Sequence, residues 1–326
     1  MATPSLKPKL LKLGLVSACS ALLLAVVLAR LDLSRLGAAL ARVQPLWLLA
    51  AGGAFLGGLL CGAVRWSAAL RAAGVSVRSG PLVRACLASH LFNVLLLSPA
   101  LGDVAKSALF ARWHGERAST IYATTLLDRA FSVGGTMLFV GLVLALFLHG
   151  PAMDELQFHG GKNSLWLWVT PLLLATVLLV VWKASPRLRE LARNVLDRLR
   201  VSSLQLRERP ALAAAGCLAG LAGQTCNTAI LPLCLASVSS MAVPWSAVMW
   251  TFPLIAVAAV LPVTVGGAGV REGAALLLLS RHGIPAEDIV AAGLLTLSVY
   301  LSWALAGAAV GWREELAFLR GQEQAM

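Results

Sequence analysis

Six long apolar stretches dominate this sequence, and each is close to the roughly 20 residues that an α-helix needs to cross a bilayer. Hydrophobic side chains make up 59% of the 326 residues and charged ones only 13%, whereas soluble domains have about 25% charged residues. So few charges cannot cover a soluble globule of this size, which excludes a soluble enzyme and predicts an all-α integral membrane protein. The six predicted crossings are Leu13–Ala29, Pro45–Val64, Tyr122–Leu148, Leu165–Trp182, Ala211–Ala236 and Ile289–Trp312.

The basic residues predict the orientation in the membrane. Lys and Arg number 27 against 15 Asp and Glu, and in membrane proteins the basic residues gather in cytoplasmic loops. Both termini and segments 65–84 and 183–210 are therefore assigned to the cytoplasm, and segments 149–164 and 237–245 to the exterior. Arg30, Arg35 and Arg42 fall on the exterior side of this topology, so we expect an amphipathic stretch at the membrane surface there. Few basic residues lie beside aromatic ones, so no nucleic-acid partner is expected.

The chain is expected to form one polytopic membrane domain over residues 1–326, with a first half at 1–148 and a second half at 165–312. Leu13–Ala29 follows three lysines, as in a signal peptide, but no small-x-small cleavage site leads into a polar chain, so it is expected to remain as the first crossing. Segment 183–210 repeats leucine and valine at helical spacing among arginines. This predicts a basic amphipathic helix on the inner leaflet; the alternative is a solvated linker.

Two further apolar regions, Leu82–Trp113 and Trp245–Leu279, are interrupted by proline, glycine and charge. Irregular backbone at membrane depth is tolerated only where protein or water satisfies its polar groups. We interpret the regions as re-entrant helical hairpins that enter from opposite sides, an inverted repeat around a substrate site. The alternative is that proline and glycine kink two ordinary helices. The expected breaks and hinges are Asn93, Pro99 and Gly102 in the first region and Pro262, Gly266, Gly267 and Gly269 in the second.

Several charged and polar side chains lie inside the apolar sequence, and each is a functional hypothesis because it needs a polar surrounding at that depth. Asp103 and Lys106 are three residues apart on one helix face and can pair. The adjacent Asp128 and Arg129 point about 100° apart and need separate partners. Arg271 follows a glycine-rich break at a helix start, which suits a phosphate. The candidate substrate-binding residues are Asp103, Lys106, Arg112, Asp128, Arg129, Gln224, Asn227, Arg271 and Glu272.

Two alternatives for these residues stay open. The charged groups can serve only to neutralise one another and lock the hairpins. The amide side chains of Gln224 and Asn227 can serve only to connect helices by hydrogen bonds, as polar residues in membrane proteins often do.

The sequence carries no signature of hydrolase or redox chemistry. It contains no G-x-S-x-G, no G-x-x-x-x-G-K-[ST] and no H-E-x-x-H. The six cysteines form no C-x-x-C pair, and the five histidines form no ligand pattern. We therefore expect a protein that is not an enzyme and that needs neither a metal nor a cofactor.

Three motifs resemble a known family. They are Phe92-Asn93-x-Leu95-x-x-Ser98-Pro99-x-x-Gly102-Asp103-x-x-Lys106, Asp128-Arg129, and Leu261-Pro262-x-x-x-Gly266-Gly267-x-Gly269-Val270-Arg271-Glu272. They resemble the lysylphosphatidylglycerol synthase transmembrane-region family, the flippase-like membrane half of the multiple peptide resistance factor. The resemblance runs from the second crossing to the last. It implies a polytopic inner-membrane protein with two re-entrant helical pairs, in which a lipid path is lined by Asp103, Lys106, Arg129, Arg271 and Glu272.

The sequence also departs from the family pattern. Asp128 stands where the family usually has Glu, Ser132 where an acid often follows, and Val265 where Pro is frequent, and no Arg lies near Leu297. The aminoacylated lipid of the family is therefore not carried over as the substrate. The chain ends at Met326, so we expect no aminoacyl-transferring domain and no lipid synthesis by this chain alone.

These observations predict a lipid translocase of the bacterial inner membrane that moves a phosphate-bearing lipid or lipid-linked head group between leaflets. The expected partners are membrane lipids with anionic or polyprenyl-phosphate head groups. Two alternatives stay open. One is a non-transporting scaffold that presents a lipid precursor to a partner transferase, and the other is a small-solute secondary transporter.

Overall fold

The computed structural model describes residues 32–95, 99–115, 117–147, 206–239 and 270–323, with isolated positions at 197, 200, 241, 243, 245, 248 and 249. Every regular element in these ranges is helical, and they contain no strand. The all-α prediction is confirmed to that extent. The elements are α2 (Leu33–Ala41), α3 (Pro45–Ala72), α4 (Ser79–Leu95), α5 (Pro99–His114), α6 (Ala118–Phe147), α10 (Pro210–Val238), α12 (Val270–Leu279), the 3₁₀ turn η2 (Ser280–His282) and α13 (Ala286–Glu323).

Four of these helices are long and apolar enough to cross a membrane, namely α3, α6, α10 and α13. They coincide with the second, third, fifth and last predicted crossings. The first and fourth predicted crossings, the predicted exterior segment 149–164 and most of the basic segment 183–210 lie outside the described residues.

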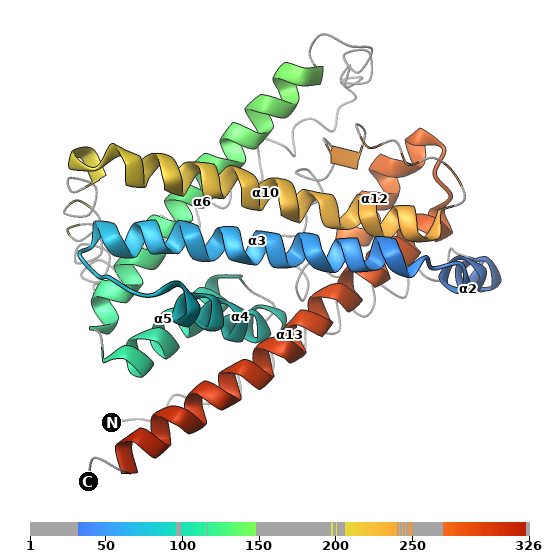
Figure 1. Cartoon of the computed structure of the whole chain (residues 1–326). Helices are drawn as coiled ribbons and strands as arrows, with labels where there is room; N and C mark the ends of the chain where they lie inside the picture. The colour runs from blue at the N-terminus through green and yellow to red at the C-terminus, as the bar shows by residue number, and fades with distance from the viewer. Residues whose placement is uncertain are drawn as a thin grey trace, which may run out of the picture.

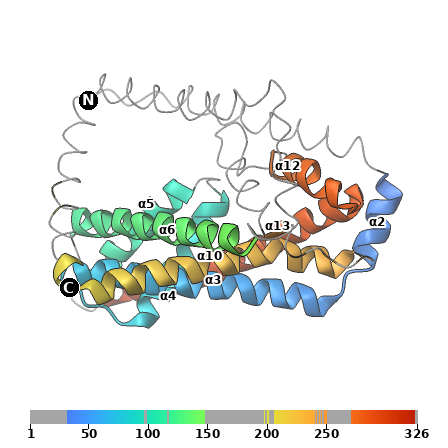
Figure 2. The ribbon, with the colours of Figure 1, turned by 90° about the horizontal axis from the view of Figure 1, so that it is seen from above.

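The centre of the fold is an antiparallel pair of helices, α3 and α10, which lie side by side in both ribbon views (Figures 1 and 2). Gln44 N–H donates to the Ser237 carbonyl at 2.9 Å at one end of the pair, and Cys61 packs on Gly223 further along it. Glycine also allows α6 to approach α10 closely, since a Cβ on Gly135 would overlap the Gly220 backbone. Small residues at helix contacts allow this close approach in membranes.

Two of the long helices, α3 and α13, continue about two turns or more past the C-terminal end that the sequence predicts. The second crossing was expected to end at Val64, with segment 65–84 as a cytoplasmic loop, but α3 continues to Ala72. The reason is local, because three of the seven residues from 66 to 72 are alanine, the best helix former. The last crossing was expected to end at Trp312, but α13 continues to Glu323 and is about 57 Å long.

The first interrupted region forms two helices that pack against each other, α4 and α5, with residues 96–98 between them. The predicted break lies there, but α5 already begins at Pro99, so Gly102 and Asp103 belong to its first turns. Gly102 has no space for a Cβ because the Asn93 side chain occupies it. Asn93 therefore closes α4 onto the start of α5.

Only α12 of the second interrupted region is well described. Pro262, Gly266, Gly267 and Gly269, with the expected second break, lie outside the described residues, so the inverted repeat stays a prediction.

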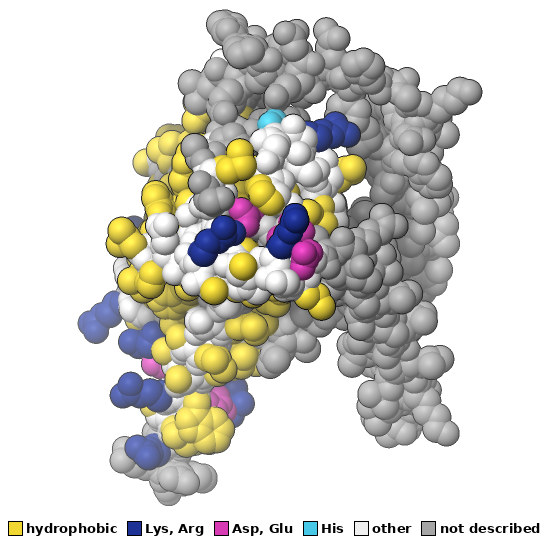
Figure 3. Space-filling view, turned by 90° about the vertical axis from the view of Figure 1, so that its right-hand side faces the viewer, with side chains coloured by type: hydrophobic (Ala, Val, Ile, Leu, Met, Phe, Trp, Pro, Cys, Tyr) yellow, Lys and Arg dark blue, Asp and Glu magenta, His cyan; other side chains and the backbone are white. Residues whose placement is uncertain are grey.

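The helix α2 is short and lies across the end of α3 (Figures 1 and 2). Asp32 caps its start by accepting a hydrogen bond from Ser34 N at 2.9 Å, and Leu36 and Ala39 are its buried residues. Arg42, at its end, pairs with Asp288 of α13 at 3.3 Å. Basic and acidic side chains lie close together among hydrophobic ones at this end of the molecule (Figure 3). The amphipathic stretch expected around residues 30–42 corresponds to this helix.

Candidate functional site

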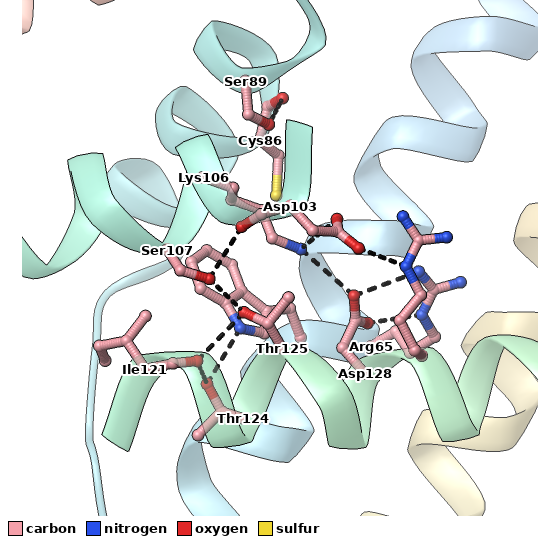
Figure 4. Close-up of polar contacts among 12 residues, drawn as sticks. Arg65, Cys86, Ser89, Asp103, Lys106, Ser107, Ile121, Thr124, Thr125 and Asp128 are labelled. Atoms are coloured by element: carbon pink, nitrogen blue, oxygen red, sulfur yellow. Dashed lines mark hydrogen bonds and ion pairs between the residues drawn. The ribbon is translucent and has the colours of Figure 1, made fainter. Parts of the chain in front are cut away.

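Five charged side chains from three helices form one network (Figure 4), which we call the charge cluster. Arg65 Nε of α3 lies 2.6 Å from Asp128 Oδ1 of α6, and Lys106 Nζ of α5 lies 3.2 Å from Asp128 Oδ2. Lys106 also lies 3.7 Å from Asp103 Oδ1, one helical turn earlier in α5. Asp103 in turn pairs with Nε of Arg129. The predicted pairing of Asp103 with Lys106 and the separate partners of Asp128 and Arg129 are confirmed.

The charge cluster is an alternating chain that begins and ends with a cation. Its order is Arg65, Asp128, Lys106, Asp103 and Arg129, so that each carboxylate lies between two basic groups. The five residues carry three positive and two negative formal charges. An anionic group that approaches either end therefore meets a guanidinium, the donor geometry that suits phosphate and carboxylate oxygens.

Burial within the cluster is graded. The side chain of Asp128 is 2% exposed and that of Lys106 is 7% exposed, whereas that of Arg129 is 44% exposed. Asp128 lies about 15 Å along α6 from the start at Ala118, and Arg65 lies about 10 Å from the end of α3. The cluster is thus inside the helical bundle, and Arg129 forms its accessible edge.

Aromatic and hydroxyl groups hold the buried half of the cluster in place. The fully buried indole of Trp66 lies 4.4 Å from Lys106 Nζ and donates from Nε1 to Thr124 Oγ1 at 3.2 Å. A cation over an indole face is stabilised electrostatically, most strongly where water is excluded. Ser107 and Thr125 hydroxyls share a 2.7 Å hydrogen bond that joins α5 to α6. Lys106 is therefore held by the Trp66 indole and by the carboxylates of Asp103 and Asp128 (Figure 4).

The other predicted site residues lie elsewhere. Arg112 pairs with Glu315 of α13 at 2.7 Å and is half exposed. Gln224 lies within hydrogen-bond distance of Thr136 on α6, and Asn227 packs against Gly58 of α3, so both amides contact neighbouring helices. The backbone of Arg271 and Glu272 is described at the start of α12, but their side chains lie outside the described residues. Of the nine candidates, the structure brings together Asp103, Lys106, Asp128 and Arg129.

Sequence reasoning misses Arg65, because it assigns this residue to the cytoplasmic segment 65–84 after the second crossing. It lies within α3, its side chain is 17% exposed, and it makes the shortest contact with Asp128. Its position supplied one signal, since the alanine-rich stretch that follows it continues the helix. A cation followed by two more helical turns lies inside a crossing and needs a partner.

Comparison with known proteins places the chain. A family model described as the lysylphosphatidylglycerol synthase TM region matches residues 10–307. The chain belongs to this family. The match covers every residue of the charge cluster, and the family expected from the sequence is confirmed. Family membership and the four long apolar helices make the chain a multi-pass membrane protein with a lipid-related role. No curated protein matches the sequence.

Proposed function

We propose that this member of the family is a lipid translocase that moves a phosphate-bearing lipid, or a lipid-linked head group, between the leaflets of the bacterial inner membrane. It acts as a carrier and not as an enzyme, and it works without a metal or a cofactor. Its ligands are lipids with an anionic or polyprenyl-phosphate head group.

The observation that carries this proposal is the charge cluster. Charged groups at bilayer depth cost several kcal/mol unless they are paired, and they mark substrate or ion pathways in membrane proteins. Well-packed apolar residues would stabilise a bundle at least as well as buried ion pairs do. A cluster of five such residues from α3, α5 and α6 is therefore better explained by a ligand than by stability.

The helices α4 and α5 support the idea of a re-entrant hairpin. They contain 17 and 16 residues, about 25 Å each, which is short of the roughly 30 Å hydrocarbon core. They pack against each other, and α5 carries Asp103 and Lys106. In the proposal this pair enters the bilayer from one side, and the region that includes α12 enters from the other.

In the proposed mechanism, a phosphate first binds Arg129 at the accessible edge of the cluster. It competes with Asp103 for that guanidinium, which loosens the contact between α5 and α6. Lys106 and Arg65 then stabilise the anion deeper in the bundle, while the acyl chains stay in the bilayer. Arg271 and Glu272 complete the path from the second half of the chain.

The test is leaflet exchange in proteoliposomes. Purified protein would be reconstituted with a fluorescent phospholipid or a polyprenyl phosphate, and exchange would be followed by quenching of the outer leaflet. The variants Arg65→Gln and Arg129→Gln are expected to lower the rate at least tenfold, because each removes a charged hydrogen-bond donor from the path. The matched control is Arg71→Gln, an exposed arginine of the same helix as Arg65, which should exchange lipid at the wild-type rate.

The opposite results would redirect the assignment. If the wild-type protein exchanges no lipid but co-purifies with a lipid-modifying transferase, it is a scaffold that presents a precursor. If it exchanges no lipid and takes up a small solute, it is a secondary transporter. Equal loss of exchange in the Arg71→Gln control would mean that the cluster has no special role.

A further inference from the structure

Two consecutive glutamates of the last helix form ion pairs with α4 and α5. These contacts lie at the end of the α4–α5 pair that is away from the break at residues 96–98, which we call its base. Glu314 Oε1 lies 2.6 Å from Arg84 Nε of α4, and Glu315 Oε1 lies 2.7 Å from Arg112 Nη2 of α5. Glu315 Oε2 also accepts a hydrogen bond from Trp113 Nε1 at 3.1 Å. One helix turn of α13 thus holds both arms of the pair.

Next to these ion pairs, α13 packs closely against α4. A Cβ on Gly307 would overlap the Leu87 carbonyl of α4, and one on Gly311 would lie 3.1 Å from the Ala88 Cβ. Glycines at positions 307 and 311 and a glutamate at 314 recur at helical spacing, so they share one face of α13. Because α13 runs antiparallel to α4 here, the glutamates reach α4 at its outer end, on the side away from the break at residues 96–98.

The pair is therefore attached at two places of different character. At its base, α13 holds it through ion pairs that are about one quarter to one half exposed. Further in, Asp103 and Lys106 attach α5 to α3 and α6 through the buried charge cluster. If a ligand loosens the inner attachment, the base contact is what keeps α4 and α5 in register with the rest of the bundle.

We propose that Glu314 and Glu315 are positioning residues, which hold α4 and α5 by their base so that Lys106 and Asp103 return to the same place in each cycle. This inference rests on the proposed translocation for its purpose, but the placement itself is testable without any lipid. The glutamates pair with Arg84 and Arg112, which are not members of the charge cluster, so their effect on it has to pass through α4 and α5.

The experiment measures the distance between α4 and α13 in the full-length protein in nanodiscs. Nitroxide labels would be placed at Ser79 and Ala317, both exposed, in a background without the native cysteines, and read by double electron–electron resonance. The double variant Glu314→Gln/Glu315→Gln should broaden the distance distribution. It should also slow leaflet exchange about fivefold, the scale of a partly exposed ion pair. The matched control Arg313→Gln/Arg320→Gln, on exposed neighbours in the same helix, should change neither.

A charge swap separates positioning from damage to the fold. Arg84→Glu combined with Glu314→Arg keeps the pair with reversed polarity and should restore a narrow distribution and most of the exchange rate. A distribution that stays narrow in the double glutamine variant, or a swap that restores nothing, would overturn the inference. So would a broadened distribution with unchanged exchange. If wild-type protein exchanges no lipid, the proposed function fails, and the distance measurement still decides whether the glutamates hold the pair.

Discussion

Asp128 is the carboxylate that connects α3 to α5 within the charge cluster. It lies between Arg65 and Lys106, and its side chain is 2% exposed. Removing one partner of a buried ion pair leaves an uncompensated charge in a medium of low dielectric constant. Loss of the Asp128 charge would leave the two cations Arg65 and Lys106 without the carboxylate between them.

The variant Asp128→Asn should therefore be strongly destabilised, by about 3–5 kcal/mol. Asn has nearly the same shape, so the loss would come from charge and not from packing. The measurement is the midpoint of thermal unfolding in detergent, followed by tryptophan fluorescence. The control is Glu208→Gln, which removes the same charge from an exposed position; this variant should unfold near the wild-type temperature. Equal midpoints for the two variants would contradict the prediction.

At this scale the sequence predicts pairs that are close in the chain and misses those that are distant. Asp103 and Lys106 lie one helical turn apart, so their pairing follows from the spacing alone. Arg65 and Asp128 are 63 residues apart, and Arg112 and Glu315 are 203 apart. No local pattern connects such residues, because their contact depends on how whole helices pack.

The helices α6 and α10 pack closely because glycines lie at their contact. Gly135 and Gly220 bring the two backbones into direct contact, and Gly216 leaves room for the ring of Phe131. Such contacts replace the hydrophobic effect, which gives little driving force between helices in lipid.

Replacing Gly135 by alanine should separate α6 from α10 and cost about 1–3 kcal/mol, the usual range for overpacking. The paired control is Gly141→Ala in the same helix, where a Cβ would meet nothing within 4 Å. Alanine is the better helix former there by about 1 kcal/mol, so this control should raise the unfolding temperature or leave it unchanged. A stability gain in Gly135→Ala would show that the helices are not packed this closely.

Helix existence was predictable and helix ends were not. Runs of apolar residues give α3, α6, α10 and α13, since about 20 such residues form a crossing. The ends differ because hydropathy falls at the first charge, whereas the helix persists while its residues favour it. The polar end of α13 is an example, because the pairs that Glu314 and Glu315 make with α4 and α5 keep it helical against the bundle.

The molecule as a whole is asymmetric in charge. One end gathers the C-termini of α3, α5 and α13 with the N-termini of α4, α6 and α10, as their short connections and contacts require. Basic residues outnumber acidic ones there, which is typical of a cytoplasmic side. At the other end, acids and bases pair, as Arg42 does with Asp288. The exposed arginines of the first end include Arg71, Arg78, Arg117, Arg209, Arg313 and Arg320.

This asymmetry predicts which end faces the cytoplasm. In intact cells, a membrane-impermeant maleimide should label Ser34→Cys on α2 and should not label Ser76→Cys, which lies between α3 and α4; both positions are exposed. Permeabilised cells serve as the control, since both variants should then react. The reverse pattern would invert the proposed orientation and place the base of the α4–α5 pair outside.

The length of α13 has a consequence for the choice of host membrane. Its apolar portion, from Ile289 to Trp312, extends about 36 Å against a hydrocarbon thickness of about 30 Å. Such a mismatch is relieved by tilting, and the tilt grows as the bilayer thins. The acyl-chain length of the host lipid should then determine the tilt of α13. Because α4 and α5 are attached to this helix, their orientation relative to the bilayer should change with it.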